Sequence, residues 1–211
     1  RARNCANYNH ALRLFHPIMA VFTEVSESKA QELLTQLQLG DLVELQGIQG
    51  GIENTNYFLT SSVGTYVLTL FERLTHQQLP FYLHLMKHLA HHGIPVPDPV
   101  ANSDGDILLT LEGKPAAVVN RLIGSSELAP TPQHCHAVGD MLARMHLAAQ
   151  DYTLFQPNLR GLAWWNETTP QVLPFIPAAA QTLLSTELQF QQAFAASDVY
   201  RALPHGPIHA D

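Results

Sequence analysis

Glycines and small polar residues with the potential to bind an anion gather between Gln46 and Asn56, a stretch that reads QGIQGGIENTN. Glycine tolerates positive φ, so the backbone amides around Gly50 and Gly51 can converge on a phosphate. Three side chains that follow add further groups able to bond phosphate oxygens: Asn54, Thr55 and Asn56. A tight hairpin turn with a bulge also accounts for paired glycines, so this stretch alone leaves both interpretations open.

Histidines form a second cluster with potential chemistry, between Leu79 and Gly93 in LPFYLHLMKHLAHHG. Histidines four residues apart on a helix can share a zinc ion. At about 100° per residue, however, they fall on the side away from the apolar stripe, and no cysteine or acidic residue nearby completes a ligand set. The pattern favours a solvated helix face, and we predict no metal site at His84, His88, His91 and His92.

The overall composition excludes several classes of protein. Apolar residues make up 46% of the 211-residue chain and charged residues 14%, which is typical of a globular protein. The net charge of −7 argues against a general nucleic-acid or anionic-membrane surface. No apolar run approaches the length of a membrane span, so we expect a soluble protein with no nucleic-acid or membrane partner.

The two cysteines, Cys5 and Cys135, provide neither a disulfide framework nor a CxxC motif. We therefore expect a reducing, cytoplasmic location. Cys135 lies in a predicted helix, at a position where we expect a small core residue. His146 lies near the same helix face, and we expect it to be a satisfied structural histidine rather than a catalytic one.

The first half of the chain predicts a mainly antiparallel sheet with two helices. Residues 1–18 are basic and lack acids, and we expect a poorly ordered extension outside the fold. Ser28 and Gln31 form a capping-box pattern ahead of the Leu33, Leu34 and Leu37 stripe, and Gly40 ends that helix. A second helix begins at Pro80, with an apolar face of Tyr82, Leu85, Met86 and Leu89, and ends at Gly93. The predicted strands are Asp41–Ile48, Asn56–Thr60, Tyr66–Phe71, Ile107–Leu111 and Pro115–Arg121.

The second half is predicted to be helical. Residues 122–126 form the expected linker, after which Thr131 and Pro132 begin a helix with apolar residues at helical spacing. A looser segment, residues 155–175, precedes a second helical stretch from Ala178 to Tyr200. We expect the large aromatic side chains of the looser segment to serve in packing: Trp164, Trp165 and Phe175.

Together, four stretches resemble the homoserine kinases of the aminoglycoside-phosphotransferase-like type, within the protein-kinase-like superfamily. They are GGIENTNYFLTSSVGTYVLTLFE, LPFYLHLMKHLAHHGIPVPDPV, VGDMLARMHLAA and the terminal GPIHAD, which resembles the start of an H-x-D-x-x-x-x-N catalytic loop. The likeness covers residues 19–211. It implies an α+β, two-lobe fold with an antiparallel small lobe (residues 19–121), a hinge (122–126) and an incomplete helical large lobe (127–211).

The resemblance also implies a chemistry: phosphorylation of the L-homoserine hydroxyl by ATP with Mg²⁺, in threonine biosynthesis. Gly50, Gly51 and the amides through Asn56 would cover the phosphates, and backbone groups from Asn120 to Leu122 would meet the adenine. Asp211 would accept or orient the hydroxyl proton, and His209 would hold the loop in shape.

Two departures from the kinase pattern stand out. Thr69 occupies the place where a typical kinase has a phosphate-contacting lysine, which leaves Arg73 and Lys87 as unassigned alternatives. The chain also ends before the loop asparagine and the later aspartate that bind the metal, so we expect the 211-residue chain to be an inactive fragment. Two alternatives remain open: a kinase of the same fold for another acceptor (an amino alcohol, an aminoglycoside or a methylthio-sugar), and a non-catalytic nucleotide-binding module.

Overall fold

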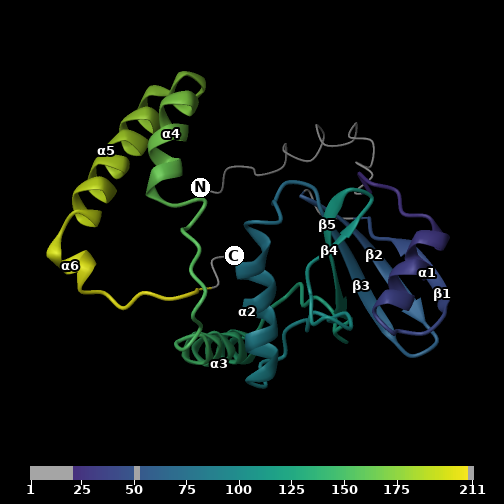
Figure 1. The fold of residues 1–211 in the computed structure, drawn as a ribbon. Helices are drawn as coiled ribbons and strands as arrows, with labels where there is room; N and C mark the ends of the chain where they lie inside the picture. The colour runs from purple at the N-terminus through teal and green to yellow at the C-terminus, as the bar shows by residue number, and fades with distance from the viewer. Residues whose placement is uncertain (1–20, 50–52, 209–211) are drawn as a thin grey trace, which may run out of the picture. The chain divides into compact units, whose positions relative to one another are not determined.

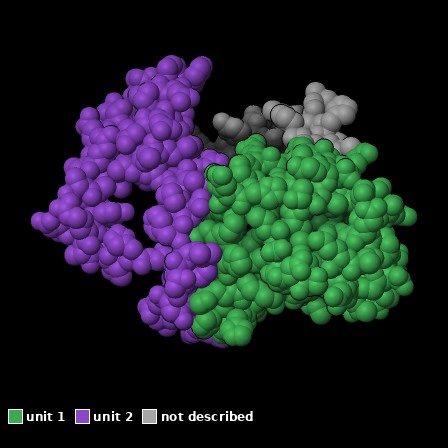
Figure 2. Space-filling view, viewed as in Figure 1, with its two compact units in different colours: residues 1–130 green, residues 131–211 purple. Residues whose placement is uncertain are grey.

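A computed structural model describes residues 21–49 and 53–208 of the chain (Figure 1). The predicted extension of residues 1–18, together with Gly50, Gly51, His209 and Asp211, lies outside the described residues. The chain divides into two compact units, residues 1–130 and 131–211 (Figure 2), and each is treated by itself below. The predicted linker, residues 122–126, lies in an irregular, exposed segment just before that division. None of the described helices is long and apolar enough to cross a membrane.

The first unit contains a five-stranded sheet in the order β1-β2-β3-β5-β4. All four pairings are antiparallel, as the short connections predict. The turn between β4 and β5 has positive φ at both central residues, Glu112 (51°) and Gly113 (72°), the conformation that joins tight hairpins. The strands are β1 (Leu42–Gly47), β2 (Asn54–Ser61), β3 (Thr65–Phe71), β4 (Leu109–Leu111) and β5 (Lys114–Asn120).

Helix α1 (Glu27–Gln36) covers one face of this sheet. Its N-cap is Ser26, whose hydroxyl accepts a hydrogen bond from Lys29 N, so the predicted cap at Ser28 is wrong by one half-turn. Ser26 has the extended backbone that a cap needs, whereas Ser28 is already helical. The predicted leucine stripe is confirmed, because Leu33, Leu34 and Leu37 are buried against the sheet.

Helix α2 (Leu79–His91) packs against the opposite face of the sheet (Figure 1). Leu79 and Leu83 form a small core with Ala117 of β5. The predicted apolar face is therefore wrong in part: Leu83 is buried, whereas Tyr82 and Leu85 are only half-buried. The helix ends, as predicted, at a glycine in the left-handed region, Gly93 with a φ of 73°.

The second unit is helical throughout its described elements. They are α3 (Pro132–Ala148), α4 (Leu162–Val172), the 3₁₀ turn η1 (Leu173–Phe175), α5 (Ala178–Ala195) and α6 (Asp198–Arg201). Thr131 caps α3 as predicted, in a reciprocal box with His134. The segment expected to be loose contains α4, with Pro170 inside the helix. The predicted helix to Tyr200 breaks after α5, where the Ser197 hydroxyl caps α6.

Several side chains expected in the core of the second unit are exposed. Cys135 and His146 on α3 face solvent, because no part of the described chain covers that side of the helix. Phe175 is 87% exposed and does not pack as predicted. Trp164 and Trp165 are only partly exposed, and they line a cavity of about 290 Å³ between α4 and α5.

Candidate functional site

The sheet presents two chemically different faces, because strand side chains alternate. On β2, Thr55, Tyr57 and Leu59 are buried on the α1 side. Asn56 and Phe58 point the other way and are half-buried. We call this second side, on which α2 packs against Ala117 and Phe71, the open face.

A polar row crosses the open face beside Ile48, the residue that follows β1. Asn56 pairs with Thr69 in the β2–β3 ladder, and Thr69 pairs with Ala117 of β5. The Thr69 hydroxyl donates to Asn56 Oδ1 at 2.8 Å. Ile48 N donates to the carbonyl of Asn56 at 2.8 Å, so the segment that leads toward the glycines is held directly beside this row.

A row of apolar side chains lies next to the polar row on the same face, two residues further along each strand. Phe58 pairs with Val67, and Val67 pairs with Val119. The guanidinium carbon of Arg121 lies 4.1 Å from the centroid of the Phe58 ring, within cation–π range. No motif in the sequence indicated this row, although strict alternation from Asn56 places Phe58 on the same face.

Thr55 does not share the open face with its neighbours. Its side chain is fully buried, and its hydroxyl accepts from Phe22 N and Thr23 N and donates to Glu72 Oε1. With three hydrogen bonds the hydroxyl has no capacity left for a ligand. Successive side chains of a strand point to opposite faces, so the Thr55 side chain points away from the open face. The expected contact between the Thr55 side chain and phosphate is therefore wrong.

The segment predicted to meet adenine leaves the sheet at Asn120. The Asn120 side chain accepts from Asp98 N at 2.6 Å, so it secures a neighbouring segment rather than the open face. Arg121 N donates to the Thr65 carbonyl at 3.1 Å, which extends the β3–β5 pairing by one residue. Leu122 follows with its side chain 43% exposed.

The basic side chains near β3 are already engaged. Arg73 lies 3.7 Å from Glu53 in an exposed ion pair. Lys87 on α2 pairs with Asp98 at 2.9 Å and also donates to the Pro99 carbonyl at 3.0 Å. Neither contact places a cation in the Asn56–Thr69 row, so the partner for phosphate charge is still unassigned.

Glu72, which follows β3, carries a perturbed carboxyl group. Burial raises its pKa, but hydrogen bonds from Lys114, Thr55 and Thr23 more than offset this effect, and the pKa lies below its ordinary value of 4.5. Glu72 and Lys114 form an ion pair in which only 12% of the Glu72 side chain is exposed. This pair lies on the α1 side, and no local pattern in the sequence predicts it, because Lys114 is 42 residues away from Glu72.

The open face suits a ligand with a flat apolar part and an anionic part. The Phe58–Val67–Val119 row offers contact area to an aromatic ring, and the side chains of Asn56 and Thr69 beside it offer hydrogen-bonding groups. A nucleotide has both parts. The polar row is neutral, so a hard divalent ion such as Mg²⁺ would need its carboxylate ligands from another part of the protein.

The fold is that of the protein-kinase-like phosphotransferases. The chain is similar to an amicoumacin kinase solved with AMP-PNP and Ca²⁺, with a TM-score of 0.57 and 20% identity over 79% of this chain and 54% of that one. It is also similar to AMP-bound spectinomycin phosphotransferase, with a TM-score of 0.52 and 14% identity over 84% of this chain and 60% of that one. A sequence profile described as "Phosphotransferase enzyme family" matches residues 44–211, and the chain belongs to this family.

Several homoserine kinases are much more similar to this chain in sequence than these solved structures are. A homoserine kinase of Polaromonas naphthalenivorans (strain CJ2) is 64% identical over 193 residues, which is 92% of this chain and 61% of the relative. A homoserine kinase of Paraburkholderia phytofirmans is 58% identical over 92% of this chain and 58% of the relative. The chain thus spans about three fifths of the length of the relatives it matches.

Proposed function

We propose that the protein containing this chain transfers the γ-phosphoryl group of ATP to the side-chain hydroxyl of L-homoserine, giving O-phospho-L-homoserine and ADP, a step of threonine biosynthesis. The observation that carries the proposal is the 64% identity to a homoserine kinase over 92% of the chain. Membership of the phosphotransferase family and the two-row open face support the same reaction class.

The nucleotide would lie along the open face. Its base would rest on the Phe58–Val67–Val119 row, near the backbone from Asn120 to Leu122. Its phosphates would extend toward Asn54, Asn56 and Thr69, under the amides of Gly50 and Gly51. Mg²⁺, when bound, would neutralise charge on the phosphates, with ligands supplied from outside this face.

The acceptor chemistry would fall to the end of the chain. In the transfer, the bond between the γ-phosphorus and the β–γ bridging oxygen breaks, and a bond from the homoserine oxygen to the γ-phosphorus forms. Asp211 would take or orient the hydroxyl proton, and His209 would hold the loop that presents Asp211. Because both residues lie outside the described part of the chain, these roles are inferred from the resemblance.

The proposed partners are two small molecules, ATP and L-homoserine. The net charge of −7 supports the exclusion of nucleic acid and anionic membranes as partners. The absence of a disulfide framework in the sequence supports a cytoplasmic location.

Release of ADP by the full-length protein, measured with homoserine and with a panel of other hydroxylated acceptors, tests the proposal. We expect homoserine to give the highest kcat/KM, and Asp211→Asn to abolish turnover while AMP-PNP still binds. A preference for an amino alcohol, an aminoglycoside or a methylthio-sugar would overturn the proposed acceptor. Nucleotide binding without transfer to any acceptor would favour a non-catalytic module. We expect the isolated 211-residue chain to show no turnover.

A further inference from the structure

Residues 21–25, which we call the strap, precede α1 and are bonded to the buried side of β2. The Thr55 hydroxyl accepts from Phe22 N at 2.9 Å and from Thr23 N at 3.1 Å. The Tyr57 hydroxyl donates to the Thr23 carbonyl at 2.9 Å and accepts from Val25 N at 3.0 Å. Two side chains of one strand therefore satisfy four backbone groups of the strap, which has no regular structure of its own.

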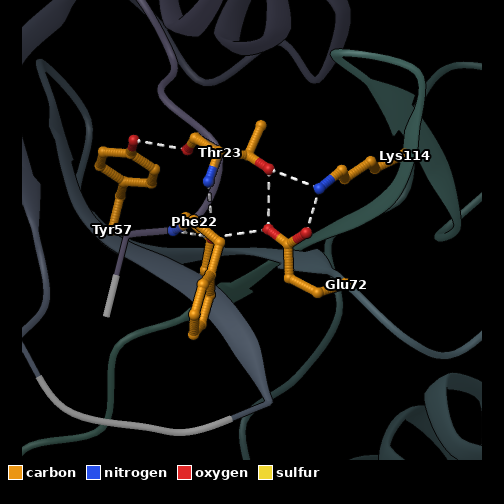
Figure 3. Close-up of polar contacts among 6 residues, drawn as sticks. Phe22, Thr23, Tyr57, Glu72 and Lys114 are labelled. Carbon is orange, nitrogen blue, oxygen red and sulfur yellow. Dashed lines mark hydrogen bonds and ion pairs between the residues drawn. The ribbon is translucent and has the colours of Figure 1, made fainter. Parts of the chain in front are cut away.

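The Glu72 carboxylate joins this arrangement to the rest of the sheet (Figure 3). Glu72 Oε1 accepts from the hydroxyls of Thr23 (2.8 Å) and Thr55 (2.7 Å). Lys114 at the start of β5 donates to the Thr23 hydroxyl at 2.7 Å and pairs with Glu72 Oε2. The strap, β2, the end of β3 and the start of β5 thus meet at a single carboxylate.

The strap in turn supports the end of β1. A Cβ atom added to Gly47 would lie 2.9 Å from Cγ2 of Val21, so the Gly47 backbone lies directly on the strap. Gly47 pairs with Tyr57, and the next residue, Ile48, donates to the Asn56 carbonyl. A displacement of the strap would therefore be transmitted to Gly47 and Ile48, next to the polar row of the open face.

Glu72 cannot act on a ligand of the open face directly. Thr55 and Tyr57, with which it shares this network, point to the α1 side of β2, whereas Asn56 and Thr69 point to the other side. Any influence of the Glu72–Lys114 pair on a bound nucleotide is therefore indirect, through Thr55 on β2 and through the strap to Gly47.

We propose that Glu72, together with Lys114 and Thr55, is a positioning residue: it fixes the strap beneath Gly47 and so sets the place of Gly47 and Ile48 beside the Asn56–Thr69 row. The proposal rests on nucleotide binding as proposed above. Support from groups behind the contacting residues is a general requirement for a well-ordered binding site.

Two variants of the full-length protein test the proposal: Glu72→Gln, which keeps the side-chain volume, and Thr55→Val, which removes one hydroxyl. We expect the Kd for AMP-PNP to rise about tenfold in each, the equivalent of one lost charge-assisted hydrogen bond. Thr55→Ser retains the hydroxyl and should bind as the unaltered protein does. The matched control is Glu32→Gln, which removes the exposed Lys29–Glu32 ion pair on α1.

Amide hydrogen exchange without nucleotide supplies an independent readout. In Glu72→Gln we expect faster exchange at Ile48, and unchanged exchange at Leu68 and Leu70 in the buried part of β3. Equal acceleration at all three amides, with the Kd for AMP-PNP unchanged, would show a purely structural role and overturn the inference. If the unaltered protein binds AMP-PNP but does not phosphorylate homoserine, the proposed reaction is wrong. The positioning role of Glu72 is then still decided by the Kd for AMP-PNP and by the amide exchange rates.

Discussion

The Thr69 hydroxyl donates to Asn56 Oδ1 at 2.8 Å, across the ladder that joins β2 and β3. This bond fixes the Asn56 amide so that Nδ2 remains a donor, with only a long 3.5 Å contact to the Asn54 carbonyl. A neutral pair therefore occupies the place that the kinase resemblance assigns to a lysine. We interpret Thr69 as the residue that orients the Asn56 donor, rather than as a weak substitute for a cation.

Substitution of Thr69 by valine tests this interpretation in the full-length protein. The change keeps the branched shape but removes the donor, so Asn56 loses its orientation. We expect the KM for ATP to rise about fivefold to tenfold, consistent with the roughly 1 kcal/mol of a neutral hydrogen bond. The KM for homoserine should not change. Thr65→Val is the matched control, because Thr65 lies on the same face of β3 but pairs with Thr60, away from Asn56. Equal effects of both variants on ATP would contradict the assignment.

The Glu72 carboxylate should make the free energy of unfolding depend on pH. Its pKa is depressed in the folded protein, so below its ordinary value of 4.5 the unfolded chain binds a proton that the folded chain does not. The stabilisation is therefore complete above about pH 4.5 and is lost as the pH falls through the lower, folded-state pKa. Glu72→Gln should lower the free energy of unfolding by about 1–3 kcal/mol at neutral pH.

Urea unfolding followed by circular dichroism at a series of pH values provides the measurement. The difference between the unaltered protein and Glu72→Gln should shrink as the pH falls below about 4.5, because protonation removes the ion pair with Lys114. The exposed Glu32→Gln variant should differ little from the unaltered protein at any pH. A difference that stays constant down to acid pH would exclude a charge-dependent role for Glu72.

Local patterns in the sequence predicted the elements of the first unit well. The five antiparallel strands and the leucine stripe of α1 both follow from short-range signals that the structure confirms. The position of the α1 cap was missed because Ser26 and Ser28 both offer a hydroxyl, and only backbone conformation distinguishes them. Pro170 concealed α4 because a proline inside a helix is disfavoured by local rules, yet this one is accommodated near the helix end.

The site was less predictable, since it depends on which face each side chain takes and on contacts distant in sequence. The alternation of side chains on β2 places Thr55 on the opposite face from Asn54 and Asn56, although all three were expected to act together. The strap, Glu72 and Lys114 are joined across 91 residues, and no local pattern indicates such a contact. The predicted roles of Gly50, Gly51, His209 and Asp211 stay predictions, because these residues lie outside the described part of the chain.

Gly47 is predicted to be intolerant of even a methyl group. Its alanine variant would bring a Cβ to 2.9 Å from Val21 Cγ2, closer than ordinary van der Waals contact. We expect a loss of about 1–2 kcal/mol in the free energy of unfolding, and partial recovery when Val21→Ala removes the opposing methyl groups. A double-mutant cycle by urea unfolding measures the coupling. Strict additivity of the two changes would show that Val21 does not support Gly47.

Phe58 provides a test of the proposed base position. If the nucleotide base rests on this ring, Phe58→Ala should raise the Kd for AMP-PNP about tenfold in the full-length protein, which is about 1.4 kcal/mol and near the upper end of the range for an aromatic contact. Phe58→Leu should lose less, because it retains apolar area. Arg121→Ala removes the guanidinium over the ring, an exposed contact worth about 0.5–1 kcal/mol, and should change the Kd by less than about fivefold. A larger loss for Arg121→Ala than for Phe58→Ala would assign base binding to the guanidinium and not to the ring.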